Sequence, residues 1–569
     1  MPSLPSPVLD SLRASTRRRF LQQCGTGMGA LALGSLLNDQ LFAADSGVPT
    51  LGKPHFAPKA KNIIYLFQSG GPSHLDLFDP KPELQKRNGQ QVPEDLVKNI
   101  RLAQIGKEAK LLASPYKFAQ HGKSGVWISE LMPHLQSIAD DVCFVQGFHS
   151  EAFNHDPATI FMNTGAQLAG RPAMGSWFSY GLGSENKDLP AFVVLMTGVG
   201  QPLTNAAWGS GFLPTTHQGV TLRSQGDAVL FVSNPPGIDG TRRRQSLDVL
   251  KDLNQARYDV LQDPEIQTRI NSYELAYRMQ TSVPEVMDIS KETAKTQAAY
   301  GTTPGRASFA NNCLLARRLV ERGVRFVQLY HRGWDHHGGP DGNLIFDLKK
   351  RCLETDQPAV ALIRDLKERG LLDETLVLWG GEFGRTPMMQ GALKPDQIGR
   401  DHHPHGYTVW MAGGGIKPGM VYGRTDDFGF YAVENKVHVH DLHATILHLF
   451  GVDREADVAA DGSRVGCHDA EVEDPRAAGA RRSRSLVRPL IRTPRPRRAA
   501  ASAALRTRCR RWVPDRHRRE MPRRYGAGGA ACSPTTIGHM RGPAGIRRFR
   551  VGRSSPSAGR SAGSRARQR

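Results

Sequence analysis

Cysteine is scarce in this chain, and long apolar runs are missing. Seven cysteines occur in 569 residues, and only Cys143, Cys313 and Cys352 lie between the basic N-terminal segment and the arginine-rich C-terminal segment. They show neither a CxxC spacing nor an even-numbered framework, which argues against a disulfide scaffold and a cysteine-based metal site. The apolar stretch 25–37 is shorter than the ~20 residues that a bilayer-spanning helix needs. The sequence therefore predicts buried structural thiols and no transmembrane segment.

Lysine is absent from residues 476–569, although that segment is strongly basic. It holds 27 arginines and two acidic residues, so its net charge is +25 (27 − 2). Because the whole chain carries +21, residues 1–475 carry −4 (21 − 25). The excess of positive charge therefore lies in residues 476–569. Residues 1–475 are not expected to bind nucleic acid.

The C-terminal segment 454–569 also lacks apolar periodicity. Arginine without lysine, diluted by Gly, Pro, Ala and Ser, is the composition expected when GC-rich DNA is translated in the wrong frame. We interpret this segment as an arginine-rich disordered tail, which a frameshift near residues 453–460 would explain. The alternative is a natural basic arm that binds nucleic acid or an anionic polymer. Translation of the gene in the other two frames distinguishes the two hypotheses.

Residues 1–44 have the features of a twin-arginine signal peptide. Arg17 and Arg18 precede Phe20 and Leu21, a glycine-diluted apolar stretch follows, and the small residues 43–44 offer a cleavage site. The alternative is an ordinary basic N-terminus that precedes a buried helix. The twin-arginine pathway exports proteins that are already folded, often with a metal inserted. We therefore expect a periplasmic or extracellular protein.

Strand and helix patterns that follow one another in residues 55–453 predict an α/β domain. Short apolar runs indicate buried strands at 61–67, 140–148, 188–196, 325–330 and 374–381. The stretch 240–300 is mostly helical in pattern, and amphipathic helices are expected at 308–323 and 344–369. The strand, helix and strand between 325 and 381 form a βαβ unit, which predicts parallel strands joined by a right-handed crossover.

Polar side chains follow both strands of this unit. Asp335, His336 and His337 come after the first strand, and Glu382 and Arg385 come after the second. The carboxyl ends of parallel strands open on one edge of a sheet, where α/β proteins bind ligands. The segment "GRDHHPHG" (399–406) leads into a further predicted strand at 407–413 and reaches the same edge.

Histidine and carboxylate that meet at one edge form a nitrogen and oxygen ligand set for a divalent metal such as Zn or Mn. The alternative is that these histidines only cap loops and satisfy backbone groups. Histidines and carboxylates that come from separate segments to the same edge of the sheet favour a site that binds a metal or an anion. The spacing does not say which of His402, His403 and His405 coordinates.

Six motifs resemble, in sequence order, the exported proteins catalogued as domain of unknown function 1501. They are "FQSGGPSHLDLFDPKPEL", "NHDPATIFMNTG", "GWDHHGG", "GGEFGRTP", "GRDHHPHGYTVWMAGGGIKPGMVYGRTD" and "VHVHDLHATILHLFGVD". The likeness covers residues 15–453. That family is sulfatase-like and related to the alkaline phosphatase and sulfatase superfamily. The resemblance implies an alkaline phosphatase-like, three-layer α/β/α fold with a mostly parallel central sheet and a metal-dependent hydrolase ancestry.

The resemblance also implies a remodelled site. Gln68-Ser69 stands where sulfatases have paired aspartates that bind metal, and Glu382-Phe383 stands in place of a later Asp-His pair. His155 occupies the position of the Cys or Ser nucleophile. Formylglycine cannot form from histidine, so ordinary sulfatase chemistry is not expected.

The residues that resemble the ligands of the superfamily's first metal are present in this sequence. Asp335, His337 and a histidine from 402–405 resemble the Asp-His-His set of the first metal in phosphatases. Asp441 is expected to be a structural cap rather than a ligand, because it precedes an apolar helix expected at 444–450.

Each candidate residue has an expected role. His155 would be a nucleophile, a general base or a further ligand. Arg385 would hold an anionic oxygen bidentately, or instead form a salt bridge with a nearby carboxylate. The candidate metal ligands are Asp335, His337, Glu382, His402, His403 and His405, and we expect Asp335, His337 and either His403 or His405 to hold the cation. The candidate substrate-binding residues are Gln68, Ser69, His74 and Asn154.

These observations predict an exported sulfatase- or phosphatase-like hydrolase with a divalent metal, expected to be Zn, Mn or Ca. Its substrate would be a small or polymeric anionic ester of sulfate or phosphate. The alternative is a catalytically inactive exported protein of the same fold that recognises an anionic polysaccharide. Bound metal in the purified protein separates the two readings, because an inert scaffold does not need it.

Overall fold

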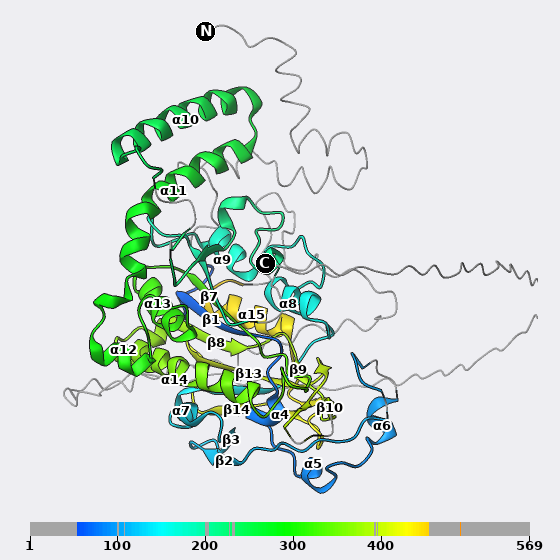
Figure 1. The fold of residues 1–569 in the computed structure, drawn as a ribbon. Helices are drawn as coiled ribbons and strands as arrows, with labels where there is room; N and C mark the ends of the chain where they lie inside the picture. Colours follow the sequence, from blue (N-terminus) through cyan, green and yellow to red (C-terminus); the bar gives the residue numbers. More distant parts are fainter. Residues whose placement is uncertain are drawn as a thin grey trace, which may run out of the picture. The chain divides into compact units, whose positions relative to one another are not determined.

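A nine-stranded, mostly parallel sheet forms the centre of the described protein (Figure 1). The computed structural model describes residues 54–98, 102–106, 108–199, 204–226, 228–229, 234–391, 394, 396–453 and 490. These residues belong to one compact unit. The predicted signal peptide and all of the predicted tail except Leu490 lie outside the described residues, so both stay predictions.

The strands of the sheet follow the order β14-β4-β13-β8-β1-β7-β5-β6, and β17 also pairs with β4. Their bounds are Asn62–Ser69 (β1), Cys143–His149 (β4), Phe192–Thr197 (β5), Val220–Leu222 (β6), Phe326–Arg332 (β7), Thr375–Gly380 (β8), Tyr407–Gly413 (β13), Met420–Tyr422 (β14) and Val437–His438 (β17). Strands β6, β5, β7, β1 and β8 are parallel. Strand β13 runs antiparallel to β8 and β4. Its first residues therefore lie at the edge where β1, β7 and β8 end.

Alternate residues of β1 pack into two separate hydrophobic cores, one on each face of the sheet. Ile64 and Leu66 join a core that contains α13 (Phe309–Glu321) and α14 (Asp347–Glu368). Ile63, Tyr65 and Phe67 join a second core, which contains α8 (His155–Thr164), α9 (Met174–Leu182) and α15 (Val439–Leu449). Because strand side chains alternate between faces, these cores define three layers. The predicted α/β/α fold is confirmed.

The βαβ unit is present as β7, α14 and β8, and both strands are parallel to β1, which lies between them. The predicted helical stretch 240–300 contains α10 (Gly240–Leu261), α11 (Pro264–Met287) and α12 (Ala294–Tyr300). Helix α15 begins at Val439, five residues before its predicted start, so Asp441 lies in its first turn. The predicted capping role still holds, because the Asp441 carboxylate accepts from the His438 backbone N–H at 3.0 Å.

Short elements complete the described fold. The short helices are His74–Leu77 (α4), Pro82–Lys86 (α5), Glu94–Val97 (α6) and Pro133–Gln136 (α7). Single 3₁₀ turns span Ala139–Asp141, Asn205–Ala207, Thr215–His217, Ile289–Lys291 and Leu372–Glu374. Four two-stranded ladders pair Phe118–His121 (β2) with Val126–Ser129 (β3), Gly384–Arg385 (β9) with His402–His403 (β12), Gln390–Gly391 (β10) with Ile398–Gly399 (β11), and Arg424–Thr425 (β15) with Ala432–Glu434 (β16).

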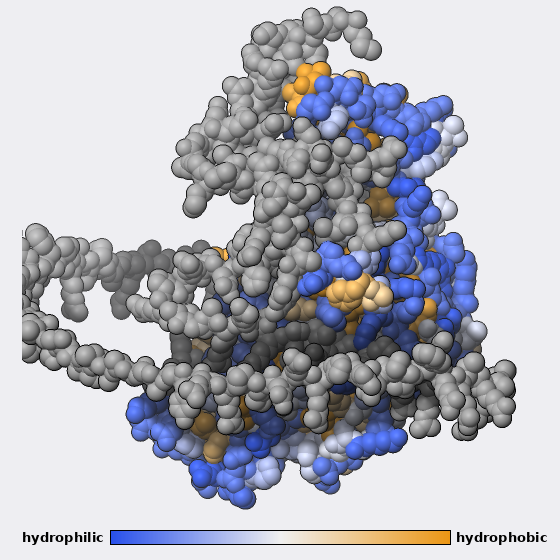
Figure 2. All heavy atoms as spheres, turned by 180° about the vertical axis from the view of Figure 1, so that it is seen from behind, coloured by the Kyte–Doolittle hydropathy of each residue, from blue (hydrophilic) through white to orange (hydrophobic). Residues whose placement is uncertain are grey.

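Helix α10 lies on the outer side of α11, away from the sheet (Figure 1). It exposes Val249, Leu253 and Val260, and apolar atoms are visible there among mostly polar ones at the top of Figure 2. Charged residues interrupt both helices. Within the described part of the chain, no helix combines the length and the apolar composition that crossing a membrane requires.

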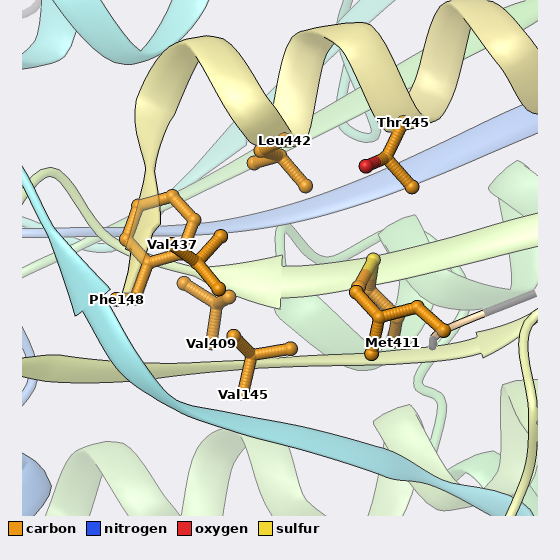
Figure 3. A pocket seen from close by; sticks show the side chains of 8 residues that line it. Val145, Phe148, Val409, Met411, Val437, Leu442 and Thr445 are labelled. Carbon is orange, nitrogen blue, oxygen red and sulfur yellow. The ribbon is translucent and has the colours of Figure 1, made fainter. Parts of the chain in front are cut away.

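An apolar gap between α15 and the strands β4, β13 and β17 is closed by side chains (Figure 3). Its lining residues are Val145, Phe148, Val409, Met411, Val437, Leu442, Thr445 and Leu490. Leu490 is fully buried, and its carbonyl accepts from the Lys417 backbone N–H at 2.7 Å.

Cys143, Cys313 and Cys352 are free and buried, as predicted for structural thiols. Burial raises the pKa of the Cys143 thiol to about 12.

Candidate metal centre

A glycine allows three strand ends to approach one another closely. Gly70 follows β1 with a φ of +121°, and a Cβ atom there would lie 2.5 Å from the backbone nitrogen of Asp335. The Gly70 N–H donates to Glu382 Oε1 at 2.8 Å, after β8. The Trp334 N–H, after β7, donates to the Ser69 carbonyl at 3.1 Å. Only glycine combines this backbone conformation with the space available, so Gly70 is required for the three segments to meet.

A two-residue ladder beside this edge decides which way the histidines of 399–406 point. Strand β9 pairs antiparallel with β12, so that His402 lies opposite Arg385 and His403 lies opposite Gly384. Neighbouring residues of a strand point to opposite faces. His402 and Arg385 therefore point toward Asp335, and His403 points away from it.

Four side chains converge at this place, namely Asp335, His337, His402 and His155. The Oδ1 atom of Asp335 lies 2.9 Å from His337 Nε2 and 3.1 Å from His402 Nε2. The Oδ2 atom lies 3.2 Å from His155 Nε2. His402 is buried and the other three side chains are partly exposed, so the cluster opens to solvent on one side.

Each imidazole of the cluster is oriented by a hydrogen bond from its Nδ1 atom. The partners are Glu382 Oε1 at 2.7 Å for His155, Gln390 Oε1 at 2.6 Å for His337 and the Phe153 carbonyl at 2.8 Å for His402. All three partners are oxygens, so each Nδ1 carries a proton and donates it. The three Nε2 atoms then face Asp335. Histidines that bind metals usually have this arrangement, in which the second nitrogen donates to a carboxylate or carbonyl.

Burial and charge shift the pKa values of the cluster in different directions. Burial opposes ionisation of Asp335, but the Arg385 charge and the bonds to the imidazoles outweigh it and hold its pKa far below the usual range. Burial also opposes protonation of His155, yet the contacts with Asp335 and Glu382 raise its pKa to about 9. Burial is the main cause that lowers the pKa of His402 to about 4. Without metal, an ionised Asp335 therefore lies between a protonated His155 and a neutral His402.

The donor set fits a divalent cation. The Nε2 atoms of His337 and His402 lie 2.9 Å apart, and Asp335 Oδ1 is at 2.9 and 3.1 Å from them. In their neutral forms, both imidazoles turn unshared electron pairs on Nε2 toward each other and toward the carboxylate. Such a set repels itself unless a proton or a cation lies between its members. Imidazole nitrogens with one carboxylate oxygen are common ligands of Zn²⁺.

Arg385 is surrounded by oxygen atoms of the protein and is 1% exposed. Its guanidinium donates to the carbonyls of Gly71 (2.8 Å), Arg400 (3.0 Å), Trp334 (3.3 Å) and Gly70, and to Asp335 Oδ1 (2.7 Å). This is the salt bridge that the sequence left open as an alternative. The fork of donors needed for bidentate binding of a substrate oxyanion is already used, so Arg385 serves the site as a fixed positive charge.

Three of the predicted imidazoles lie outside the cluster. They include His403 and His405, one of which was expected to hold the cation, and His402 lies beside Asp335 and His337 in their place. His403 Nε2 bonds to the Phe430 carbonyl, and its ring packs against the Phe430 ring at an angle of 34°, with centroids 3.9 Å apart. His405 stacks on Tyr431, and His74 Nε2 bonds to the Gly429 carbonyl at 2.9 Å. Burial lowers the pKa of all three. Neutral, backbone-bonded rings are the structural role that the sequence left as an alternative for this loop.

The remaining predicted residues surround the cluster without joining it. Glu382 is buried behind His155 and bonds to it and to the Gly70 N–H. The Gln68 side-chain nitrogen donates to the Leu66 carbonyl at 3.2 Å, and Ser69 is buried at the end of β1. Asn154 is the N-cap residue of α8 but its side chain makes no capping bond. The adjacent His336 is buried, and burial lowers its pKa to about 3.

Two residues at the cluster carry no signal in the sequence. Gln390 lies in β10 and bonds to His337. Gln104 comes from the segment 102–106, and its Nε2 lies 3.4 Å from His337 Nε2. Neither glutamine belongs to a recognisable motif, and only their position in space links them to the site.

Several solved structures are similar to this chain. The PsFucS1 sulfatase from Pseudoalteromonas sp. is 13% identical in sequence, with a TM-score of 0.31. The match covers 80% of this chain and 74% of the sulfatase chain. Alkaline phosphatase from the Antarctic bacterium TAB5 is 10% identical, covers 70% and 100%, and has a TM-score of 0.27. The lipoteichoic acid synthase LtaP from Listeria monocytogenes is 9% identical, covers 72% and 76%, and has a TM-score of 0.26. None of the curated proteins matches this chain.

A family model matches most of the chain. It covers residues 60–474 and is described as a protein of unknown function, DUF1501. This is the family that the six motifs of the sequence resemble. The match includes the elements that carry Asp335, His337, His402 and His155. The chain therefore belongs to the DUF1501 family.

Proposed function

We propose that this protein is an exported, metal-dependent hydrolase that acts on phosphate or sulfate esters. The observation that carries the proposal is the orientation of three imidazoles. Each of them donates its Nδ1 proton to a protein oxygen and directs Nε2 toward Asp335. A loop that only satisfied backbone groups would not direct three Nε2 atoms at one carboxylate.

The cation would be held by Asp335, His337 and His402, with His155 as a fourth ligand or as a proton carrier beside it. Three nitrogens and one carboxylate favour Zn²⁺ or Mn²⁺. Ca²⁺ takes six to eight oxygen ligands, and this donor set supports it less. When bound, the cation would supply Lewis-acid polarisation of an ester oxygen and activation of water.

The residues of the chain supply charge and proton transfer at this site. Arg385 adds a permanent positive charge that lies 2.7 Å from Asp335, and it favours an anionic substrate through its field rather than by contact. His155 lies at the first position of α8, and Glu382 holds its Nδ1. Its Nε2 proton is the one that can be transferred to or from a substrate oxygen at the open side.

The start of α8 offers a place for the anionic group of the substrate. Backbone N–H groups of a first helical turn carry partial positive charge and bind phosphate and sulfate groups well. The Asn154 side chain makes no bond to this turn, so its amide and the free N–H groups of His155 and Asp156 are available to ester oxygens.

A screen of the purified full-length protein on aryl phosphate and aryl sulfate esters, with added Zn²⁺, Mn²⁺ or Ca²⁺, tests the proposal. We expect hydrolysis that depends on the metal and is lost in His337→Ala. His405→Ala is the matched control, because that imidazole lies in the same region outside the cluster, and it should keep the activity. Hydrolysis that His337→Ala leaves unchanged would remove the cluster from the mechanism. The absence of both bound metal and hydrolysis of any ester would favour the catalytically inactive binding protein.

Export by the twin-arginine pathway is a separate part of the proposal. It rests on the arginine pair and apolar stretch of residues 1–44. A fusion of this segment to a reporter that matures only after folded export tests it, with Arg17 and Arg18 replaced by lysine as the control. Export that persists in the control, or no export at all, would contradict a twin-arginine signal.

A further inference from the structure

We infer that Gln390 is a positioning residue that fixes the tautomer of His337 and thereby sets the affinity of the cluster for its cation. The inference rests on the proposed metal site and adds to it a residue outside the ligand set. Of the three Nδ1 acceptors in the cluster, Glu382 is a carboxylate and Phe153 offers a backbone carbonyl. Gln390 is the neutral side chain among them.

The amide of Gln390 can face His337 in two ways, and only one of them supports metal binding. With Oε1 toward His337 Nδ1, at 2.6 Å, the ring carries its proton on Nδ1 and leaves Nε2 free for a cation. With the amide reversed, its N–H₂ group would face Nδ1, and the proton would move to Nε2, which points at Asp335 and His402. That tautomer blocks the ligand position.

A second amide holds Gln390 in the productive orientation. Gln390 Nε2 donates to Gln104 Oε1 at 2.9 Å. Because Gln104 Oε1 can only accept, the Gln390 group that faces it is the donating N–H₂, which leaves Gln390 Oε1 to face the imidazole. The Gln104 side chain also reaches the cluster, since its Nε2 lies 3.4 Å from His337 Nε2.

The backbone around Gln104 is tied to the other histidine ligand. Asp401 is fully buried, and its Oδ2 accepts from the Gln104 N–H at 2.7 Å and the Ile105 N–H at 3.2 Å. Its Oδ1 accepts from the His402 N–H at 2.9 Å. One buried carboxylate thus holds the start of β12 and the segment that orients Gln390. A series of hydrogen bonds through Asp401, Gln104 and Gln390 therefore connects His402 with His337.

The energetic consequence follows from the chemistry of the Nδ1 acceptor. An acceptor on Nδ1 raises the basicity of Nε2 and removes the cost of choosing a tautomer. Loss of such a partner weakens metal affinity by about 10- to 100-fold in metal sites of this kind. A carboxylate in place of the amide is a stronger acceptor and preserves the effect.

Zinc affinity of the full chain, measured by competition with a chromophoric chelator at neutral pH, tests the inference without relying on activity. We expect Gln390→Leu to weaken Zn²⁺ binding by about 10- to 100-fold. Gln390→Glu should bind as tightly as wild type or more tightly. Gln397→Leu is the matched control, because Gln397 lies on the same hairpin and, among the described residues, its hydrogen bond to the neighbouring segment is made by its backbone carbonyl, to the Gly339 N–H at 2.9 Å. It should leave the affinity unchanged.

The outcomes separate this inference from the proposed function. Wild-type protein that binds neither Zn²⁺ nor Mn²⁺ overturns the metal centre, and the inference with it. Wild-type binding that Gln390→Leu leaves intact overturns only the positioning role. Equal weakening by the Leu and Glu substitutions also overturns it, because it would show a steric rather than an acceptor effect. If Gln390→Leu fails to fold, Gln104→Leu takes its place. That variant releases Gln390, and a smaller but measurable loss of affinity supports the inference.

Discussion

His402 and His403 are neighbours in the sequence, yet the structure uses them in opposite ways. His402 points its Nε2 at Asp335 in a cluster open to solvent. His403 is buried against Phe430 and bonds to a backbone carbonyl. Both lie on the two-residue strand β12, so alternation of side chains between the faces of a strand separates them. One face of this short ladder supplies chemistry, and the other supplies packing.

Two pairs of aspartate and arginine show the same contrast. Arg385 pairs with Asp335, whose side chain is 22% exposed, and Arg400 pairs with Asp76, where both side chains are 0% exposed. Burial opposes ionisation of Asp76, but the Arg400 charge outweighs it and lowers the pKa of the carboxyl. Asp76 also accepts from the Ser73 hydroxyl at 2.5 Å. The first pair leaves a carboxylate available to ligands, whereas the second is closed and structural.

The two neighbouring histidines give the largest expected difference. His402→Ala removes a proposed ligand and should weaken Zn²⁺ binding by at least about 1000-fold, or ~4 kcal/mol. His403→Ala should keep Zn²⁺ affinity within about threefold but lower the free energy of unfolding by about 1–3 kcal/mol, because it leaves a buried carbonyl without its donor. Metal analysis and urea unfolding of both variants measure this. Similar metal loss in both would show that the alternation of β12 does not select the ligand.

The two ion pairs give the next largest difference, now in stability. Asp76→Ala leaves the fully buried Arg400 without its carboxylate and should cost about 3–5 kcal/mol of unfolding free energy. Asp335→Ala should abolish stoichiometric metal binding and cost less than about 2 kcal/mol in metal-free protein, because Arg385 keeps its carbonyl partners. Chemical unfolding in the presence of a chelator compares them. A larger loss of stability in Asp335→Ala would contradict the division between an open and a structural pair.

The smallest expected effect is a dependence on pH. Burial holds the pKa of His74 below its usual 6.5, so its neutral form stabilises the fold above pH 6.5 and this contribution is lost as the pH falls. His74→Gln keeps a donor for the Gly429 carbonyl and cannot ionise. Between pH 6.5 and 5, wild type should lose stability relative to this variant by at most about 1.4 kcal/mol per pH unit. Urea unfolding of both proteins across this range measures the difference. Parallel curves would mean that His74 titrates normally in the fold.

Much of the fold was predictable because its signals are local. The apolar run at 61–67 and the strand, helix, strand pattern of 325–381 identify β1, β7, α14 and β8 through hydrophobic periodicity. The same pattern places Asp335 and His337 just after a strand end, where ligands bind in α/β sheets. The expected start of α15 lies five residues too late, because His440, Asp441 and His443 interrupt the apolar pattern of its first turns and the helix begins at a capping box formed by His438 and Asp441.

The details of the site were not predictable because they depend on pairings between distant segments. The ladder between residues 384–385 and 402–403 selects one imidazole from a run of three. Four backbone carbonyls from three separate segments accept from Arg385, which leaves it as a fixed charge. Gln104 and Gln390 meet His337 across 233 and 53 residues, and no local pattern records such contacts.

The sequence alone determined the buried strand at 61–67, the strand, helix and strand of 325–381, the family and the presence of histidine and carboxylate after the strand ends. It could do so because periodicity and motif spacing are properties of short stretches of chain. Only the tertiary structure decided which imidazoles face one carboxylate and which are packed away. The reason is that the direction of a side chain on a short strand is set by the partner strand, and that partner comes from elsewhere in the chain.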